Sequence, residues 1–251
     1  FGNGHAYAAQ NRDKVDIHIH DKTLLAPLGW RAPRKVFVCS MTDLFGEFHS
    51  PMDIARVFSI MALCPQHTFQ VLTKRTGRMR ATMPGLGRSV WWWLAETLSG
   101  DAYDAAMYER ENLYGDDHPW PLPNVWLGVS VEDQKTADAR VSDLLATPAA
   151  RRFVSYEPAL EDVDFTRIHY DGVTRIDALS GRHGLSGAGR GPRLDQVIFG
   201  GESGPDRRPA QMDWGRAVRD QCRAAGVAFF GKQNDKVAAL PDDLMIREWP
   251  R

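Results

Sequence analysis

Short apolar runs recur along the chain, and segments with helical spacing of apolar residues lie between several of them. The runs have the length and composition of strands, most of them buried on both faces. They span residues 15–20, 35–40, 68–73, 125–130, 152–155, 196–200 and 227–230. Strands that alternate with helices favour a parallel sheet with right-handed crossovers. We therefore predict an α/β fold with a (β/α) barrel-like parallel sheet, partial or closed in the manner of a TIM barrel. A doubly wound open sheet is the alternative.

Local signals place the ends of two crossover helices. Ser50 followed by Pro51 and Asp53 combines a cap, a proline at the first position and an acidic first turn, which together predict a helix start. Asp213 is expected to cap a later helix, and Gly226 is expected to end it.

Two stretches interrupt the alternation of strands and helices. The 251 residues fit a single α/β domain, so we interpret residues 84–121 and 162–193 as insertions into that domain. Trp91-Trp92-Trp93 lies in the first insertion. We expect this run to open a helix and to pack it against the domain, with a base-stacking platform as the alternative.

Polar and charged residues follow nearly every predicted strand. In a parallel barrel these strand ends meet at one mouth, which is where such folds carry their active sites. The residues concerned are Ser40, Asp43, Lys74, Arg75, Ser130, Glu132, Asp133, Glu157, Glu202, Ser203, Lys232 and Gln233.

The strand ending at Gly200 is the most telling of these. Two glycines let the backbone turn sharply and approach a ligand closely, and Glu202 and Ser203 follow them. Across the predicted mouth, lysine and arginine side chains can hold an anionic group, while the glutamates can accept from an amine, a ribose or a base edge. The combination suits a zwitterionic or nucleotide-like small molecule.

Composition excludes several classes of protein. The net charge of −1 gives no global attraction to nucleic acid or to membranes, and no apolar run approaches the length of a membrane span. Cys39, Cys64 and Cys222 are far apart in sequence, which indicates reduced thiols in a cytoplasmic protein and no local metal motif. The sequence contains no P-loop, nucleophile elbow or zinc-protease helix.

Several motifs together resemble one family. They are VFVCSMTDLF (36–45), QHTFQVLTKR (66–75), NVWLGVSVED (124–133), RFVSYEP (152–158), VIFGGESGP (197–205), Arg208-Pro209, DQCRAAG (220–226) and residues 229–233. They resemble a phage- and prophage-associated family of uncharacterised proteins that are similar to radical S-adenosylmethionine (SAM) enzymes. The resemblance covers nearly the whole chain apart from the two insertions.

The resemblance implies a [4Fe–4S] cluster and SAM, which together generate a 5′-deoxyadenosyl radical that acts on an unknown, possibly nucleotide or nucleic-acid, substrate. Family members carry a Trp-Asn-Pro stretch and a cysteine triad near the N-terminus. This sequence has neither, and Cys39 stands where the family often has Asn. We therefore expect the segment that holds the cluster to lie upstream of this sequence, with a degenerate family member that lacks the cluster as the alternative.

With this family in view, the strand-end residues take separate expected roles. We expect catalysis from Glu157, Glu202 and Lys232. Substrate contacts are expected from Arg75, Asp133, Arg208 and Gln233. Cofactor contacts are expected from Ser40, Asp43, Lys74, Ser130, Glu132, Gly200, Gly201 and Ser203.

Two other classes of function stay open. One is a non-radical barrel hydrolase or lyase that uses Glu157 and Glu202 as acid and base. The other is a nucleic-acid-binding module whose surface combines Trp91–Trp93 with the arginine-rich part of the second insertion.

Overall fold

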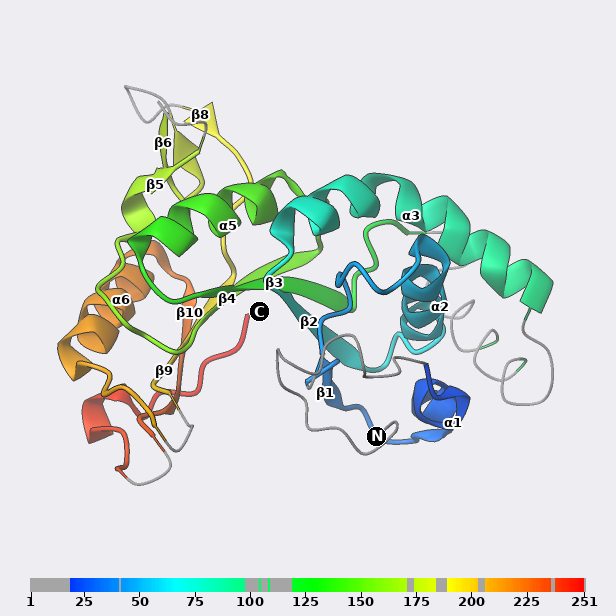
Figure 1. Cartoon of the computed structure of the whole chain (residues 1–251), viewed down its shortest axis with the longest axis horizontal. Helices are drawn as coiled ribbons and strands as arrows, with labels where there is room; N and C mark the ends of the chain where they lie inside the picture. Colours follow the sequence, from blue (N-terminus) through cyan, green and yellow to red (C-terminus); the bar gives the residue numbers. More distant parts are fainter. Residues whose placement is uncertain are drawn as a thin grey trace.

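The computed structural model describes residues 19–40, 42–97, 104, 108, 119–170, 174–183, 189–202, 206–235 and 238–250. Its centre is a sheet of six parallel strands that curls into a half-barrel (Figure 1). The strand order is β1-β2-β3-β4-β9-β10. The strands are β1 (Lys35–Val38), β2 (Thr68–Thr73), β3 (Val125–Val131), β4 (Arg151–Tyr156), β9 (Gln196–Gly200) and β10 (Ala228–Gln233).

These strands confirm the predicted parallel sheet of an α/β fold, and the barrel is partial. Each neighbouring pair in the sheet is parallel, and each strand overlaps one of the predicted apolar runs. Residues 15–18 of the first predicted strand lie outside the described residues, and Ile19 and His20 are not in a strand.

Helices cover the outside of the curved sheet (Figure 1). The long ones are α2 (Pro51–Ala62), α3 (Thr76–Thr97), α5 (Gln134–Ala146) and α6 (Met212–Ala225). Short helical turns are α1 (Asp21–Leu25), η2 (Ala26–Gly29), η3 (Phe165–Arg167) and η4 (Asp242–Leu244). None of the helices in the described part of the chain is long and apolar enough to cross a membrane.

The start of α2 is the one predicted. The Ser50 hydroxyl accepts from the backbone N–H of Asp53, and the Asp53 carboxylate accepts from the backbone N–H of Ser50 at 2.9 Å. This reciprocal capping box satisfies two backbone donors that the first turn leaves open, and Pro51 occupies the first helical position.

Helix α3 corrects the interpretation of the tryptophan run. The helix starts at Thr76 and continues through Pro84, so Trp91 lies near its end and does not open a helix. A proline inside a helix removes one backbone hydrogen bond. The helix nevertheless continues because a stripe of buried residues holds it to the core. The stripe is Met79, Met83, Leu86, Val90 and Trp93.

Helix α6 begins slightly earlier than predicted. Its cap position is Gln211, and Asp213 lies in the first turn, where its carboxylate pairs with Arg216 at 2.8 Å. Because that side chain points to Arg216 on the next turn, it does not cap the helix. Gly226 ends the helix in the left-handed conformation, with φ of 66°, as expected.

Between β4 and β9 the chain makes a small antiparallel sheet on one side of the half-barrel (Figure 1). Its strands are β5 (Ile168–His169), β6 (Arg175–Asp177), β7 (Arg182–His183) and β8 (Gly189–Arg190). The second predicted insertion, at 162–193, contains this sheet, which supplies the crossover to β9 together with η3.

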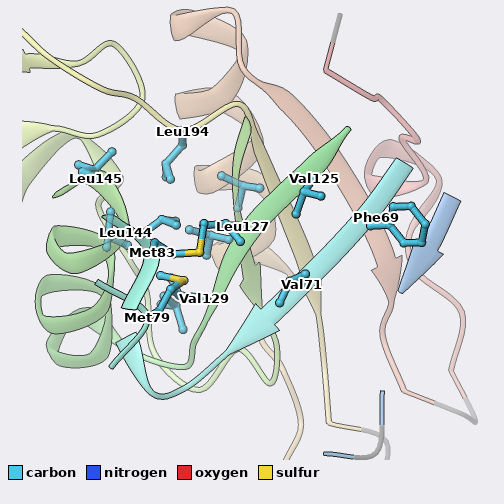
Figure 2. Packing of buried hydrophobic residues seen from close by; sticks show 14 of the residues in the cluster. Phe69, Val71, Met79, Met83, Val125, Leu127, Val129, Leu144, Leu145 and Leu194 are labelled. Carbon is cyan, nitrogen blue, oxygen red and sulfur yellow. The ribbon is translucent and has the colours of Figure 1, made fainter. Parts of the chain in front are cut away.

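The core lies between the sheet and its outer helices. Figure 2 shows Val125, Leu127 and Val129 of β3 packed toward the side of Met79 on α3 and Leu144 on α5. Each fully buried aliphatic side chain of this kind contributes roughly 1.5–3 kcal/mol. Since side chains alternate along a strand, the residues between these valines and leucines face the inside of the half-barrel.

The C-terminal segment pairs antiparallel with the edge of β10 and then brings Trp249 to the inner face of the sheet. Gly231 donates its N–H to the Ile246 carbonyl at 2.9 Å, and Glu248 donates its N–H to the Phe229 carbonyl at 3.0 Å. Trp249 then packs against Trp126 and Phe230, with ring centroids 6.1 and 5.2 Å away. The Lys35 ammonium lies 3.6 Å from the Trp249 ring centroid. This indole therefore contacts β1, β3 and β10 at once.

Candidate functional site

The carboxyl ends of the six strands form the site, which we call the mouth. The strand register places Gln70, Trp126 and Arg151 side by side, and likewise Leu72, Gly128 and Phe153. These residues face inward, and continuing the alternation brings Lys74, Glu132 and Glu157 to the inner side where the strands end. The register therefore agrees with the prediction that these strand-end residues gather at one edge of the sheet.

The first ion pair of the mouth joins the ends of β2 and β3. Lys74 Nζ lies 2.6 Å from Glu132 Oε1, and Arg140 of α5 donates to Glu132 Oε2 at 2.7 Å. Arg140 also donates to the Ser130 carbonyl at 2.8 Å. The Lys74 side chain is 51% exposed, whereas that of Glu132 is 12% exposed. The nearly buried Glu132 carboxylate is thus bound by Arg140 on the side of α5 and by the half-exposed Lys74 on the side of the solvent.

The second ion pair joins β4 to β10 and passes over β9. Lys232 Nζ lies 2.8 Å from Glu157 Oε2, and Gln233 Nε2 donates to Glu157 Oε1 at 3.0 Å. Gly200 of β9 leaves room for this contact, because a Cβ there would lie 3.2 Å from the Glu157 Cδ. The exposed fractions repeat the first pair, with Lys232 at 50% and Glu157 at 16%.

The third pair lies in the turn after β9. Arg208 binds Glu202 with its Nε and Nη2, both at 2.9 Å, and with its backbone N–H at 2.8 Å. These hydrogen bonds lower the pKa of Glu202 to about 2, so the carboxylate stays ionised at neutral pH and the ion pair breaks only as the pH falls toward 2. The charge of Glu132 raises the pKa of Arg208 further, which indicates that this pair adjoins the first one.

Asp43 is a structural anchor beneath the mouth. Its Oδ1 accepts from the Thr73 hydroxyl at 2.7 Å and from the Phe45 N–H at 3.0 Å. Its Oδ2 accepts from the Lys74 N–H at 3.0 Å and from an Arg75 guanidinium N–H at 3.1 Å. With both oxygens engaged, Asp43 fixes the turn that presents Lys74.

The remaining predicted site residues have different surroundings. Asp133 caps α5 by accepting from the Thr136 N–H at 2.7 Å, and Ser130 is buried on the inner face. Ser40 is exposed in the turn after β1. Gly201 donates its N–H to the Gln233 carbonyl at 3.1 Å, which ties the glycine turn to β10. Ser203 lies outside the described residues.

Sequence reasoning missed Arg140 and Ser155. Arg140 lies two turns into α5 and reaches back to Glu132, and nothing in its spacing marks it. Ser155 pairs in register with Ser130 and is also buried on the inner face. The alternation within β4, read outward to Glu157, could have identified it.

Cys39 has an unusual position at the end of β1. Its φ of 55° is in the left-handed region, which non-glycine residues seldom adopt. Burial, assisted by the charge of Asp43, raises the pKa of its thiol to about 11. At neutral pH about one thiol in 10⁴ is therefore ionised, and the side chain is neither a ready nucleophile nor a ready metal ligand.

The raised pKa gives a testable reactivity. Alkylation of Cys39 by iodoacetamide should be slow at pH 7 and should accelerate about tenfold per pH unit up to pH 10, because only the thiolate reacts. Intact-mass kinetics of the wild type, corrected with a Cys39→Ser variant for Cys64 and Cys222, would measure it. A rate that levels off near pH 8.5 would contradict the raised pKa.

Comparison with known proteins gives a family but no activity. The chain matches no curated protein and no solved structure. The sequence profile of a family described as Protein of unknown function (DUF5131) matches residues 3–241. That match covers most of the chain, and the protein belongs to this family.

Proposed function

We propose that this member of the DUF5131 family is the barrel part of a radical-SAM-like enzyme, and that its mouth binds the aminoacyl end of SAM. The support is a parallel half-barrel whose strands end in an ordered set of acidic and basic side chains. Ligands of such sheets bind at the carboxyl ends of the strands. The radical chemistry itself comes from the family resemblance described above.

One observation carries the proposal: the mouth holds two similar lysine–glutamate pairs. In each, a half-exposed lysine covers a carboxylate that is mostly buried. An incoming α-carboxylate can replace a glutamate as partner of the lysine, while an α-ammonium replaces the lysine as partner of the glutamate. Such an exchange leaves no buried charge unpaired, which would otherwise cost several kcal/mol. A zwitterion fits the two pairs better than an anion or a cation alone.

The inner wall offers apolar surface for the rest of the ligand. Phe37 is 45% exposed, and Leu72 and Ile198 are half-buried. Phe230 of β10 is already covered by Trp249 and by the Arg247 guanidinium. Accessible apolar side chains of this kind suit a nucleoside.

The described residues fit SAM but do not fit a [4Fe–4S] cluster. For SAM, Lys74 and Lys232 would hold the carboxylate, and Glu132 and Glu157 the ammonium. When bound, SAM supplies a reactive sulfonium centre. A [4Fe–4S] cluster needs several thiolates together, but Cys64 and Cys222 are buried in the core and the Cys39 thiol is protonated. Among the described residues no group of three or more His, Cys, Asp or Glu side chains could hold a metal, so we derive no step through a cluster.

The hydrolase alternative is limited in how it could use Glu202. A general acid must hold a proton near neutral pH, whereas Arg208 holds the pKa of Glu202 at about 2, so Glu202 could not be the acid of the pair. The structure thus offers no specific support for an acid–base pair of Glu157 and Glu202.

Calorimetric titration with SAM and with S-adenosylhomocysteine tests the proposed binding. Glu157→Gln keeps the shape of the side chain and removes the charge that Lys232 and a ligand ammonium need. We expect its affinity for both ligands to be about ten- to a hundredfold below that of the wild type, since a charge-assisted hydrogen bond is lost.

Glu161→Gln is the matched control, because Glu161 is an exposed glutamate close in sequence, and it should bind like the wild type. Thermal melts of both variants would confirm that they fold. Binding of equal strength by Glu157→Gln and the wild type, or no binding by the wild type, would refute the proposal.

A further inference from the structure

An open cleft of about 800 Å³ lies at the opposite end of the sheet from the mouth. Its walls come from Arg151 at the start of β4, from the segment Arg193–Asp195 before β9, from α6 and from the C-terminal segment with Trp249. Four arginines line it, namely Arg151, Arg193, Arg219 and Arg223. Two carboxylates, Asp195 and Glu248, line it as well.

The two carboxylates are already engaged by backbone groups. Asp195 Oδ2 accepts from the Arg152 N–H at 2.8 Å, and Glu248 Oε2 accepts from the Phe229 N–H at 2.9 Å. Arg151 lies 3.7 Å from Asp195 Oδ1, a loose ion pair. With two carboxylates against four arginines in its lining, the cleft keeps positive charge that its own carboxylates do not balance.

The arginines of the cleft differ in whether they form ion pairs with carboxylates. Arg219 pairs with Asp220 and Asp243, each at 2.8 Å. Arg193 and Arg223 are exposed, and neither forms an ion pair with a described residue. The cleft thus carries excess positive charge, although the net charge of the whole protein is −1. Its attraction for anions is therefore a local property of this site.

We propose that this cleft binds a phosphate-bearing ligand through Arg193 and Arg223. The planar guanidinium presents paired donors that match phosphate oxygens, and several arginines around one cleft suit a group with more than one negative charge. Trp249 is 36% exposed at the wall and offers an aromatic surface beside the charges. The cleft and the mouth are at opposite ends of the strands, so this site is independent of the function proposed for the mouth.

Two probes test the site on the full chain. One is pyrophosphate, followed by calorimetry. The other is a fluorescein-labelled single-stranded oligonucleotide of about 12 nucleotides, within the usual range of site sizes, followed by anisotropy at several salt concentrations. The double variant Arg193→Gln/Arg223→Gln removes the two unmatched charges. Arg88→Gln, an exposed arginine on the surface of α3, makes the same chemical change elsewhere.

We expect the wild type and Arg88→Gln to bind alike and the double variant to bind at least tenfold more weakly. If the ligand is a nucleic-acid strand, the slope of log affinity against log salt should also fall by about 1.4, from two lost phosphate contacts. Displacement of the oligonucleotide by pyrophosphate at similar concentrations would assign the site to a compact phosphate group. Oligonucleotide binding that pyrophosphate does not displace would assign it to a strand.

Two outcomes would overturn the proposal. One is that the wild type binds neither probe. The other is that the double variant, shown by thermal melting to be folded, binds both probes as Arg88→Gln does.

Discussion

Replacing Gly201 with alanine should lower the free energy of unfolding by roughly 3 kcal/mol or more, at the upper end of what overpacking costs. A Cβ at this position would lie far inside van der Waals contact of the Asn234 carbonyl oxygen, 3.0 Å from its carbon and 3.3 Å from the Ala210 Cβ. The first two are backbone atoms, which cannot rotate away. A melting temperature lower by about 6–12 °C would report the loss.

Substitutions at two other glycines serve as comparisons for the loss of stability in Gly201→Ala. Gly85 in α3 has nothing within 4 Å of its virtual Cβ, so Gly85→Ala should leave stability unchanged or raise it by up to about 1 kcal/mol. Gly200→Ala should be intermediate, because the Glu157 side chain is 3.2 Å away and can shift. Equal melting temperatures for Gly201→Ala and Gly85→Ala would show that the turn is not held against β10.

Replacing Asp43 with alanine should cost about 3 kcal/mol, because it breaks a buried hydrogen-bond network and leaves its donors without an acceptor. The carboxylate is the common acceptor for Thr73, Lys74 and Arg75. Urea unfolding with an unchanged m-value would measure the loss. SAM affinity should fall as well, since the turn that presents Lys74 loses its anchor.

A surface carboxylate is the control for Asp43. Asp21 pairs with Arg56 at 2.8 Å but is 72% exposed, and an ion pair this exposed contributes less than about 1 kcal/mol. Asp21→Ala should therefore be close to neutral. If the two substitutions cost the same, Asp43 is not the anchor that its hydrogen bonds indicate.

The strands were predictable because each coincides with a short apolar run, most clearly in β3, which is buried along its whole length. β2 and β9 have the predicted bounds, and the alternation with helices made a parallel sheet the simplest arrangement. Helix α3 was not predictable in full, because Pro84 argues against a helix locally while packing of Met83 and Val90 decides in its favour. Sequence periodicity does not weigh those two energies against each other.

The mouth was predictable as a place but not as a network. A parallel sheet brings its strand ends together, so Glu132 and Glu157 could be placed at one edge from their positions in sequence. Their partners could not, because the Glu157–Lys232 contact spans β9 and is helped by the absence of a side chain at Gly200. Such contacts depend on the three-dimensional register of strands that are distant in sequence.

The indole of Trp249 has a mechanical consequence for the mouth at the other end of the strands. It touches Lys35 on the first strand of the sheet order and Phe230 on the last, so it links the two outer strands of the half-barrel, the last of which also pairs with the C-terminal segment. When the outer strands of a curved sheet are linked at one end, they separate most easily at the other end. Any widening of the mouth to admit a ligand is therefore a pivoting of strands about this aromatic link, and the chain near Trp249 sets how stiff that movement is.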